Sequence, residues 1–481
     1  MKKRFLSNLA LLIALNLLIK PFWFFGIEVG VQNRVGESEY GFYFSLFNFA
    51  LILNILLDLG IQNYNNRAIA RNPRLLPGHL TAIVPLKFAL ALLYAVVAFV
   101  AARFLGYDRE QMHLLRVLAF NQFLASFILY FRTNISGLHL FRTDSLLSVM
   151  DRTLMILITG LLLWGRILDA PFRIQWFAYA QTASYGITLL TVVLLVRSHT
   201  GGKLPPIRLA SSLTILKASL PFALLILLMA TFNRIDSVML ERMLPDGKRE
   251  AGIYAQSFRI YDALSQFSLL FAALLLPMFS RMLRKKENVN DLIRLALPLL
   301  LVTGITAAVA GNAYKQEIIR FLYDSPSGTS GKIFGILILG FLCVSVSYVY
   351  GTLLTANRNL KVLNLLAAST VVLNLSLNLI LIPHHGALGA AWSSFISQAY
   401  YALMQVILAG RILHLPSNRD LLLRLIPLLG ASVGSAFLVR QLVPGWGMGF
   451  VLILAVSALV SLALGLIRPR EVRSILQNEE S

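Results

Sequence analysis

The chain has 481 residues, of which 57% are hydrophobic and 14% charged, and its mean hydropathy is +0.72. This composition is too apolar for an ordinary soluble domain, and the single cysteine, Cys343, excludes an intrachain disulfide bond. The formal net charge of +21 would suit nucleic-acid binding if a basic soluble module carried it, but the sequence contains no such module. We therefore expect a membrane protein without a nucleic-acid partner.

The apolar residues form long segments. A membrane-spanning helix needs about 20 mostly apolar residues, and about fourteen stretches of the chain meet that rule. In chain order the predicted spans cover residues 5–27, 41–64, 80–102, 114–137, 145–164, 172–196, 213–240, 252–279, 292–312, 333–354, 362–382, 387–412, 421–439 and 448–467. They predict an all-α polytopic membrane protein. The first segment is too long for a signal peptide and lacks a small-residue cleavage site, so we expect it to be retained.

Basic residues recur in every second connection between the predicted spans. Lys and Arg are held on the cytoplasmic side during insertion, so these connections are expected to lie inside. The first outside loop is mixed instead and carries Glu28, Arg34, Glu37 and Glu39. The residues expected inside, beside anionic lipid headgroups, are Arg67, Arg71, Arg74, Arg197, Lys203, Arg208, Lys217, Arg281, Arg284, Lys285, Lys286, Arg358, Lys361, Arg411, Arg419 and Arg424. The alternation predicts that both termini are cytoplasmic.

The connections are too short to hold a soluble catalytic domain. None exceeds about 20 residues, the length of one span, and the common hydrolase, metalloprotease, nucleotide-binding and Cys-pair metal motifs are missing from the sequence. His384 and His385 are adjacent rather than helically spaced, which favours a turn over a metal site. We expect no metal, no cofactor and no catalytic residues.

Two parts of the sequence repeat each other. Each pair of matching segments lies at an outside loop that leads into the next span, so the two copies have the same orientation. The matches are Phe24–Glu28 with Phe232–Asp236, Arg34 with Arg242, Glu39–Tyr43 with Glu250–Tyr254, and Phe47 with Phe258. They predict two six-helix lobes as parallel repeats.

The repeat also predicts the domain organisation. Residues 1–200 form an N-terminal lobe with spans 1–6, and residues 206–415 form a C-terminal lobe with spans 7–12. The Gly- and Pro-containing stretch 198–206 between them has the composition of a linker. Residues 416–481 add two C-terminal helices and a cytoplasmic tail.

Several segments resemble the polysaccharide flippases, which are O-antigen type transporters of the multidrug/oligosaccharidyl-lipid/polysaccharide superfamily. Those segments are Glu39–Tyr43, Leu57–Ile61, Ile235–Asp236, Ala251–Tyr254 with Arg259, and Asn378–Pro383 followed by Gly386–Ala391. The last is the most specific, because its glycines and alanines allow a tight connection and close helix packing. The resemblance covers spans 1–12.

The resemblance implies a function. It implies two lobes around a central cavity, alternating access, and export of an oligosaccharide on a polyprenyl pyrophosphate carrier from the inner to the outer leaflet of a bacterial inner membrane. The implied partners are this lipid-linked oligosaccharide, membrane lipids, and a polysaccharide polymerase and glycosyltransferases of lipopolysaccharide assembly. In the related lipid II flippases, the last helix pair helps to form a groove for the lipid tail.

Ionisable residues inside the predicted spans are the candidate binding residues, because burying charge in a bilayer is costly and marks functional cavities. Arg grips phosphate through its planar fork and Lys acts as a point charge, so a cationic cavity suits a pyrophosphate. In this superfamily helices 1, 2, 7 and 8 line the cavity, which favours Lys20, Arg234 and Arg259. Further candidates are Asp262, Arg132 and Arg152 for substrate, Glu28 and Asp236 as a gate, Asn48, Gln256 and Gln266 for sugar hydroxyls, and Trp23 and Tyr261 for stacking.

Structural pairing is the alternative explanation for these charges. Arg259 and Asp262 are three residues apart and can pair on one helix face. Asp58 lies near the inner end of the second span, where it can cap a helix or pair with Arg67.

Three other functions remain open. A multidrug cation antiporter of the same superfamily needs buried carboxylates, whereas the interior of the first span offers Lys20. A lipid II flippase shares the architecture. A membrane polymerase or ligase is disfavoured by the short loops and by the six-helix repeat.

Overall fold

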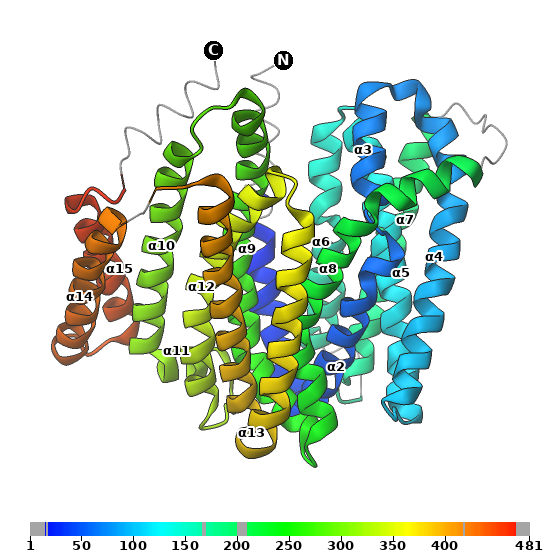
Figure 1. Cartoon of the computed structure of the whole chain (residues 1–481). Helices are drawn as coiled ribbons and strands as arrows, with labels where there is room; N and C mark the ends of the chain where they lie inside the picture. Colours follow the sequence, from blue (N-terminus) through cyan, green and yellow to red (C-terminus); the bar gives the residue numbers. More distant parts are fainter. Residues whose placement is uncertain (1–14, 16–17, 166–169, 200–208, 417–418, 468–481) are drawn as a thin grey trace. The chain divides into compact units, whose positions relative to one another are not determined.

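A computed structural model describes residues 15, 18–165, 170–199, 209–416 and 419–467, and this described part is helical without a strand (Figure 1). The contacts divide the chain into two compact units, Met1–Gly252 and Ile253–Ser481. This division lies within one helix, whereas most of the predicted linker lies outside the described residues. The predicted lobe boundaries therefore stay a prediction.

The first unit consists of membrane-length helices joined by short turns. Its elements are η1 (Phe22–Glu28), α2 (Val29–Ile52), η2 (Leu53–Leu57), α3 (Ile61–Arg71), η3 (Pro73–Leu75), α4 (Leu76–Phe104), α5 (Arg109–Gly137), α6 (Phe141–Trp164), α7 (Ile174–His199), α8 (Leu209–Met243) and the first turn of α9 (Gly247–Lys285). Helix α5 packs against α2, α3 and α7, and α8 packs against α2.

The second unit continues α9. It adds α10 (Asn290–Ala313), α11 (Lys315–Leu322), α12 (Ser330–Ala356), α13 (Leu360–Leu413), α14 (Arg419–Leu442) and α15 (Trp446–Ala463). Helix α12 packs against α10 and α13, and the C-terminal pair α14–α15 packs on α10. The short helix α11 is absent from the sequence prediction, because eight residues are too few for a span.

The number of spans agrees with the prediction of about fourteen. Twelve helices of the described part are long and apolar enough to cross a membrane, and the two longest have 40 and 54 residues. At about 1.5 Å per residue, a straight helix of 54 residues would measure about 80 Å. The hydrocarbon core of a bilayer is only about 30 Å thick. Each turns back at one glycine, Gly36 (φ 82°, ψ 172°) or Gly386 (φ 54°, ψ −135°). Figure 1 shows α13 as this hairpin.

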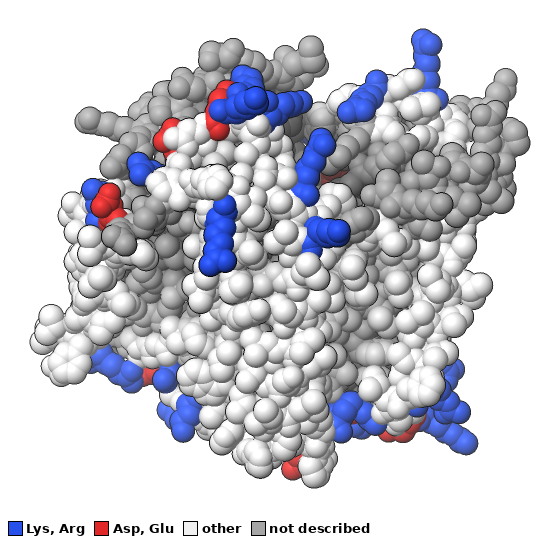
Figure 2. All heavy atoms as spheres, in the orientation of Figure 1, with Lys and Arg blue, Asp and Glu red and all other residues white. Residues whose placement is uncertain are grey.

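The outward faces of the helices are apolar, as a lipid environment requires. On α4 the exposed side chains recur every four residues, whereas Leu90, Tyr94 and Ala98 on the opposite face are buried. The exposed residues are Phe88, Leu92, Val96, Val100 and Phe104. Figure 2 shows Lys and Arg gathered toward the helix ends, with uncharged residues between. The fold is therefore that of a multi-pass membrane protein.

The prediction of one continuous helix over residues 41–64 is wrong at its C-terminal end. The helix stops after η2 at Leu57, and α3 begins at Ile61. Between them, Leu59 and Gly60 have positive φ angles of 45° and 85°. The Asp58 carboxylate accepts hydrogen bonds from the backbone N–H of Gly60 (3.1 Å) and Gln62 (3.4 Å). These bonds stabilise the break because they satisfy N–H groups at the start of α3.

Candidate functional site

The first span contains an irregular segment directly after Pro21. Residues Phe22–Glu28 form a π-helix, in which Trp23, Ile27 and Glu28 are buried. Proline removes a backbone donor and disrupts the regular helical ladder, and π-helical turns are frequent at functional sites. Lys20, one residue before the proline, is half-buried.

Three of the predicted cations lie in one neighbourhood of the first unit. Lys20 interacts electrostatically with Arg152 and Asp151 of α6 and with Arg132 of α5. Arg152 also interacts with Glu28. The structure thus brings together Lys20, Arg132, Arg152 and the predicted gate residue Glu28, which lie on three segments far apart in sequence. We call these four residues and Asp151 the α5–α6 charge cluster.

Arg152 is held on an aromatic surface within the charge cluster. Its guanidinium lies 5.3 Å from the centroid of the Trp23 ring, and Trp23 stacks on Phe177 at 5.8 Å. The Arg152 side chain also approaches Asp151 (3.9 Å) and Tyr185, yet 34% of the side-chain surface is exposed. Cation–π contact and ion pairing fix its position and leave donors accessible.

Trp23 does not offer a stacking surface to a sugar, contrary to its predicted role. Only 2% of the Trp23 surface is exposed, because the ring is covered by its neighbours. Tyr261 in the second unit is similarly buried, packed against Phe258 with ring centroids 5.6 Å apart. Both aromatic residues therefore support packing in this structure.

Arg132 is paired more completely than Arg152. Its Nε donates to Asp144 Oδ1 at 2.9 Å, and its Nη2 donates to the Asp144 backbone oxygen at 3.4 Å. These bonds connect the C-terminal end of α5 to the first turn of α6. Arg132 therefore has a structural role here, as well as its place in the charge cluster.

Arg234, one of the two predicted residues of α8, faces α2. Arg234 donates to Asn48 Oδ1 at 3.0 Å, and Asn48 donates to Ser237 Oγ at 2.9 Å. Asn48, a predicted sugar ligand, is thus engaged between the helices. Asp236 is fully buried, and Glu28, at the equivalent position of the predicted repeat, is 5% exposed.

The other predicted residues lie in the second unit. Arg259 is buried on α9, and Asp262 and Gln266 are half-buried. Gln256 accepts a hydrogen bond from Ser330 Oγ at 2.6 Å, so it is used in packing α9 on α12.

A buried lysine completes the break in the second span. The Lys87 ammonium, with a fully buried side chain, donates to the Leu57 oxygen (2.9 Å) and to Ser126 Oγ (2.8 Å) and lies 3.5 Å from Asp58 Oδ1. It also lies over two aromatic rings of α5. Asp58 therefore caps α3, as one of the two alternatives predicted, while its ionic partner is Lys87. The Arg67 side chain lies outside the described residues.

Sequence reasoning missed the polar contacts of Tyr43 and Tyr185 near the charge cluster. Gln181 donates to Tyr43 Oη at 2.6 Å, and both tyrosines lie near Arg152. Neither tyrosine carries a charge that distinguishes it from a packing residue, so the sequence offers no signal.

The described residues contain no group of three His, Cys, Asp or Glu that could hold a metal ion.

Comparisons with known proteins place the chain in a family. A family model described as "Polysaccharide biosynthesis protein" matches residues 5–283, more than half of the chain. No protein of curated function matches the chain.

Solved structures share the fold. The lipid II flippase MurJ in an inward closed conformation matches with a TM-score of 0.72 and 15% identity, over 96% of this chain and 99% of that one. An inward-facing multidrug resistance MATE transporter of the MOP superfamily matches with a TM-score of 0.60 and 17% identity, over 83% of this chain and 97% of that one. A MOP superfamily transporter from Pyrococcus furiosus, described with a binding pocket of reverse polarity, matches with a TM-score of 0.61 and 16% identity, over 84% of this chain and 94% of that one. The predicted resemblance and the predicted fold class are thereby confirmed.

Proposed function

The chain belongs to the polysaccharide biosynthesis protein family, and from this premise we propose that it is a flippase for an oligosaccharide linked to polyprenyl pyrophosphate. It moves this molecule from the inner to the outer leaflet of a bacterial inner membrane, for assembly of a cell-surface polysaccharide such as the O antigen of lipopolysaccharide. The family and the fold support the broader class, a flippase-type transporter of the MOP superfamily.

The observation that carries the proposal is the α5–α6 charge cluster. A charged residue at the centre of a bilayer costs at least about 2.5–3.5 kcal/mol on insertion scales. Lys20 and Arg152 nevertheless lie together within the spans, and Arg152 is partly exposed. A pyrophosphate competes with Asp151 and Glu28 for these cations, because its oxygens accept several charge-assisted hydrogen bonds at once.

The proposed mechanism is alternating access by two lobes, residues 1–200 and 206–415, with helices 13 and 14 in residues 416–481. Arg234, Arg259 and Asp262 are further candidates for contact with the glycan headgroup, and Glu28 and Asp236 for the gate. Both termini lie in the cytoplasm, where glycosyltransferases build the substrate. A polymerase on the other side receives the product.

A cation antiporter is the second candidate. Glu28 favours it, because a buried carboxyl on the first span is the type of group that binds a cation or a proton. Lys20 on the same span opposes it, since its ammonium repels a cationic drug. A lipid II flippase is the third candidate, and the fold shared with MurJ favours it.

A flipping assay in sealed proteoliposomes tests the proposal. A polyprenyl-pyrophosphate oligosaccharide is placed in one leaflet, and the accessibility of its glycan to an added glycan-cleaving enzyme is followed with time. Protein-dependent transfer of intact glycan supports the flippase, whereas bond formation or cleavage by the protein indicates an enzyme. Transfer of lipid II alone selects the third candidate. Absence of transfer together with expulsion of a cationic dye selects the antiporter.

A further inference from the structure

A buried carboxyl joins the end of α8 to the start of α5. The Glu241 side chain is 4% exposed, and its Oε1 accepts a hydrogen bond from Gln111 Nε2 at 2.6 Å. Gln111 is oriented by a capping box, since its Oε1 accepts from the Asp108 backbone N–H at 2.8 Å. The Glu241 Oε2 atom has no hydrogen-bond partner among the described residues.

Two hydroxyls in the same neighbourhood are buried beside each other. Tyr107, in the loop before α5, lies near Glu241 and approaches Ser45 of α2. Neither the Tyr107 hydroxyl nor the Ser45 hydroxyl completes a hydrogen bond of normal geometry within the described part of the chain. An ionised carboxylate beside such groups is expensive to bury, and a proton on Oε2 removes its charge and supplies a donor for a hydroxyl.

The surrounding charges favour a proton over a metal cation. Arg242 Nη1 lies 3.8 Å from Glu241 Oε1, and the Arg242 guanidinium lies 5.0 Å from the centroid of the Tyr107 ring. The other charged groups that face Glu241 are Lys248 of α9 and Asp108 at the start of α5. Arg242 and Lys248 carry two positive charges near Glu241, whereas Asp108 carries one negative charge, so the surrounding groups repel a metal cation.

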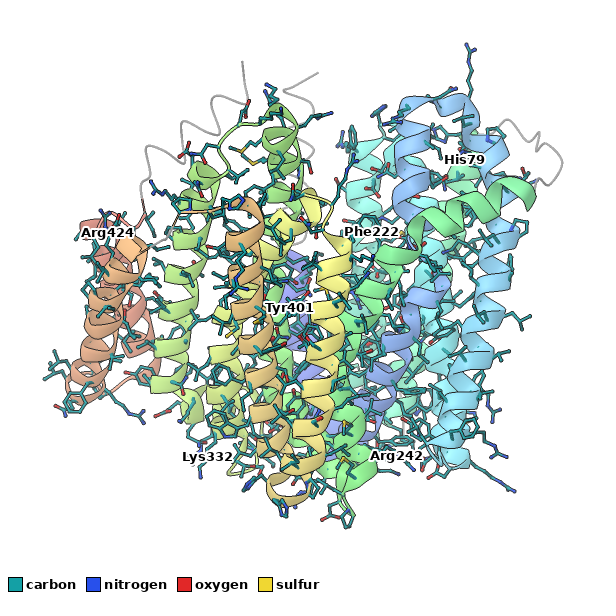
Figure 3. The ribbon with its side chains drawn as sticks, in the orientation of Figure 1. His79, Phe222, Arg242, Lys332, Tyr401 and Arg424 are labelled. Carbon is teal, nitrogen blue, oxygen red and sulfur yellow. The ribbon has the colours of Figure 1, made fainter. Side chains whose placement is uncertain are left out.

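This polar group lies where the two predicted repeats meet within the first unit. Figure 3 shows Arg242 near one end of the unit and His79 near the other. At the Arg242 end, Gln32 donates to the Gly252 oxygen at 2.9 Å, and Arg249 pairs with Glu37 at 3.3 Å. The charge pattern of the loops predicts that this end faces outside. We call the contacts at this end, made by Glu241 with Gln111 and Tyr107, by Gln32 with Gly252 and by Arg249 with Glu37, the outer latch.

We propose that Glu241 binds the proton that closes the outer latch. In the open latch, Glu241 is an ionised carboxylate that faces the outer solution. A proton from that solution forms an O–H bond at Oε2, the carboxyl becomes neutral, and α8 can then bury it against Tyr107 and Ser45. On the proposed function, this step follows release of the glycan to the outer side.

Cysteine cross-linking tests the proton step without any glycan. Cys343 is the only native cysteine, so Cys343→Ser gives a clean background. Asn48→Cys with Ser237→Cys reports closure, because these side chains are hydrogen-bonded at 2.9 Å between α2 and α8. Ser432→Cys with Ser457→Cys, whose native hydroxyls are 2.9 Å apart, is the control pair for the pH dependence of the thiol chemistry.

The yield of the reporter pair relative to the control pair is expected to rise severalfold from mildly alkaline to mildly acidic pH. Glu241→Gln, which is neutral at every pH, is expected to hold the relative yield high throughout. Glu37→Gln removes another carboxylate of the outer latch and is expected to keep the pH dependence. A relative yield that is constant with pH, or that still follows pH in Glu241→Gln, overturns the proposal.

A second variant and a transport measurement separate this inference from the proposed function. Tyr107→Phe removes one hydroxyl and is expected to move the transition to lower pH, which tests the site if Glu241→Gln fails to fold. In proteoliposomes that are acidic on the outer side, flipping is expected to accelerate severalfold in the parent and to lose this response in Glu241→Gln. If cross-linking follows Glu241 but no glycan is flipped, the flippase proposal fails and the proton site stands. If glycan is flipped without any response to pH, only the proton site fails.

Discussion

The backbone of Gly41 lies directly against the backbone of Gly252. A Cβ atom on either glycine would overlap main-chain atoms of the other helix, namely Lys248 and Gly252 beside Gly41, and Glu37 beside Gly252. These two glycines occupy equivalent positions in the predicted repeats, so the repeats contact each other through matching residues. Only glycine permits such a close crossing, because any side chain would hold the helices apart.

Gly41→Ala is expected to prevent complete closure of the outer latch. Overpacking costs about 1–3 kcal/mol, and every 1.4 kcal/mol shifts an equilibrium about tenfold. The ratio of closed to open protein, measured from the cross-linking yield of the cysteines at positions 48 and 237, is therefore expected to fall at least about fivefold. Gly186→Ala is the control, since a Cβ there meets no neighbouring atom. Equal yields in both variants would contradict the close crossing.

Arg152→Gln is expected to reduce glycan flipping at least about tenfold while the protein remains folded, because one charge-assisted contact is worth about 1.5–3 kcal/mol. Arg116→Gln, at an exposed position of α5, is expected to leave the rate unchanged. Trp23→Phe keeps an aromatic surface for the guanidinium and is expected to retain more activity than Trp23→Leu. Initial flipping rates at matched protein density provide the measurement. Full activity of Arg152→Gln would remove Arg152 from the site.

Lys87→Met is expected to lower the free energy of unfolding by about 3–5 kcal/mol, because it leaves the Asp58 charge without its buried partner. The double variant Lys87→Met/Asp58→Asn is expected to lose less stability than Lys87→Met alone, since no uncompensated charge remains. The change in Tm of the purified protein measures both effects. Lys332→Met, at an exposed position, is the control. A Tm equal to that of the parent would show that the ammonium does not stabilise the break.

Gly36→Ala is expected to destabilise the protein by about 1–3 kcal/mol, because its φ of 82° and ψ of 172° fall in a region that is essentially restricted to glycine. A Cβ at this position meets no other atom, so the loss isolates backbone strain. Gly36→Asn is expected to lose as much stability as Gly36→Ala. Asparagine tolerates the left-handed helical region, but not the backbone angles of Gly36. The comparison uses Tm, with Gly186→Ala again as the matched helical glycine.

The fold class and the family resemblance can be read from the amino-acid sequence alone. The bilayer requires each span to be long and apolar, so segments such as 80–102 are recognised without knowledge of their neighbours. The repeat was also readable, because matching polar residues such as Glu39 and Glu250 stand at corresponding ends of spans.

The tertiary structure decided which residues are partners. The intramembrane charges Lys20, Arg132 and Arg152 were visible in the sequence, but their grouping depends on how α5, α6 and the first span pack. The break after Leu57 depends on an ammonium supplied by α4, thirty residues later. Helical periodicity tells which residues share a face, but it carries no information about the helix that the face will meet. For that reason the pairing of Lys87 with Asp58, and the contact of Gly41 with Gly252, appear only when the helices are packed.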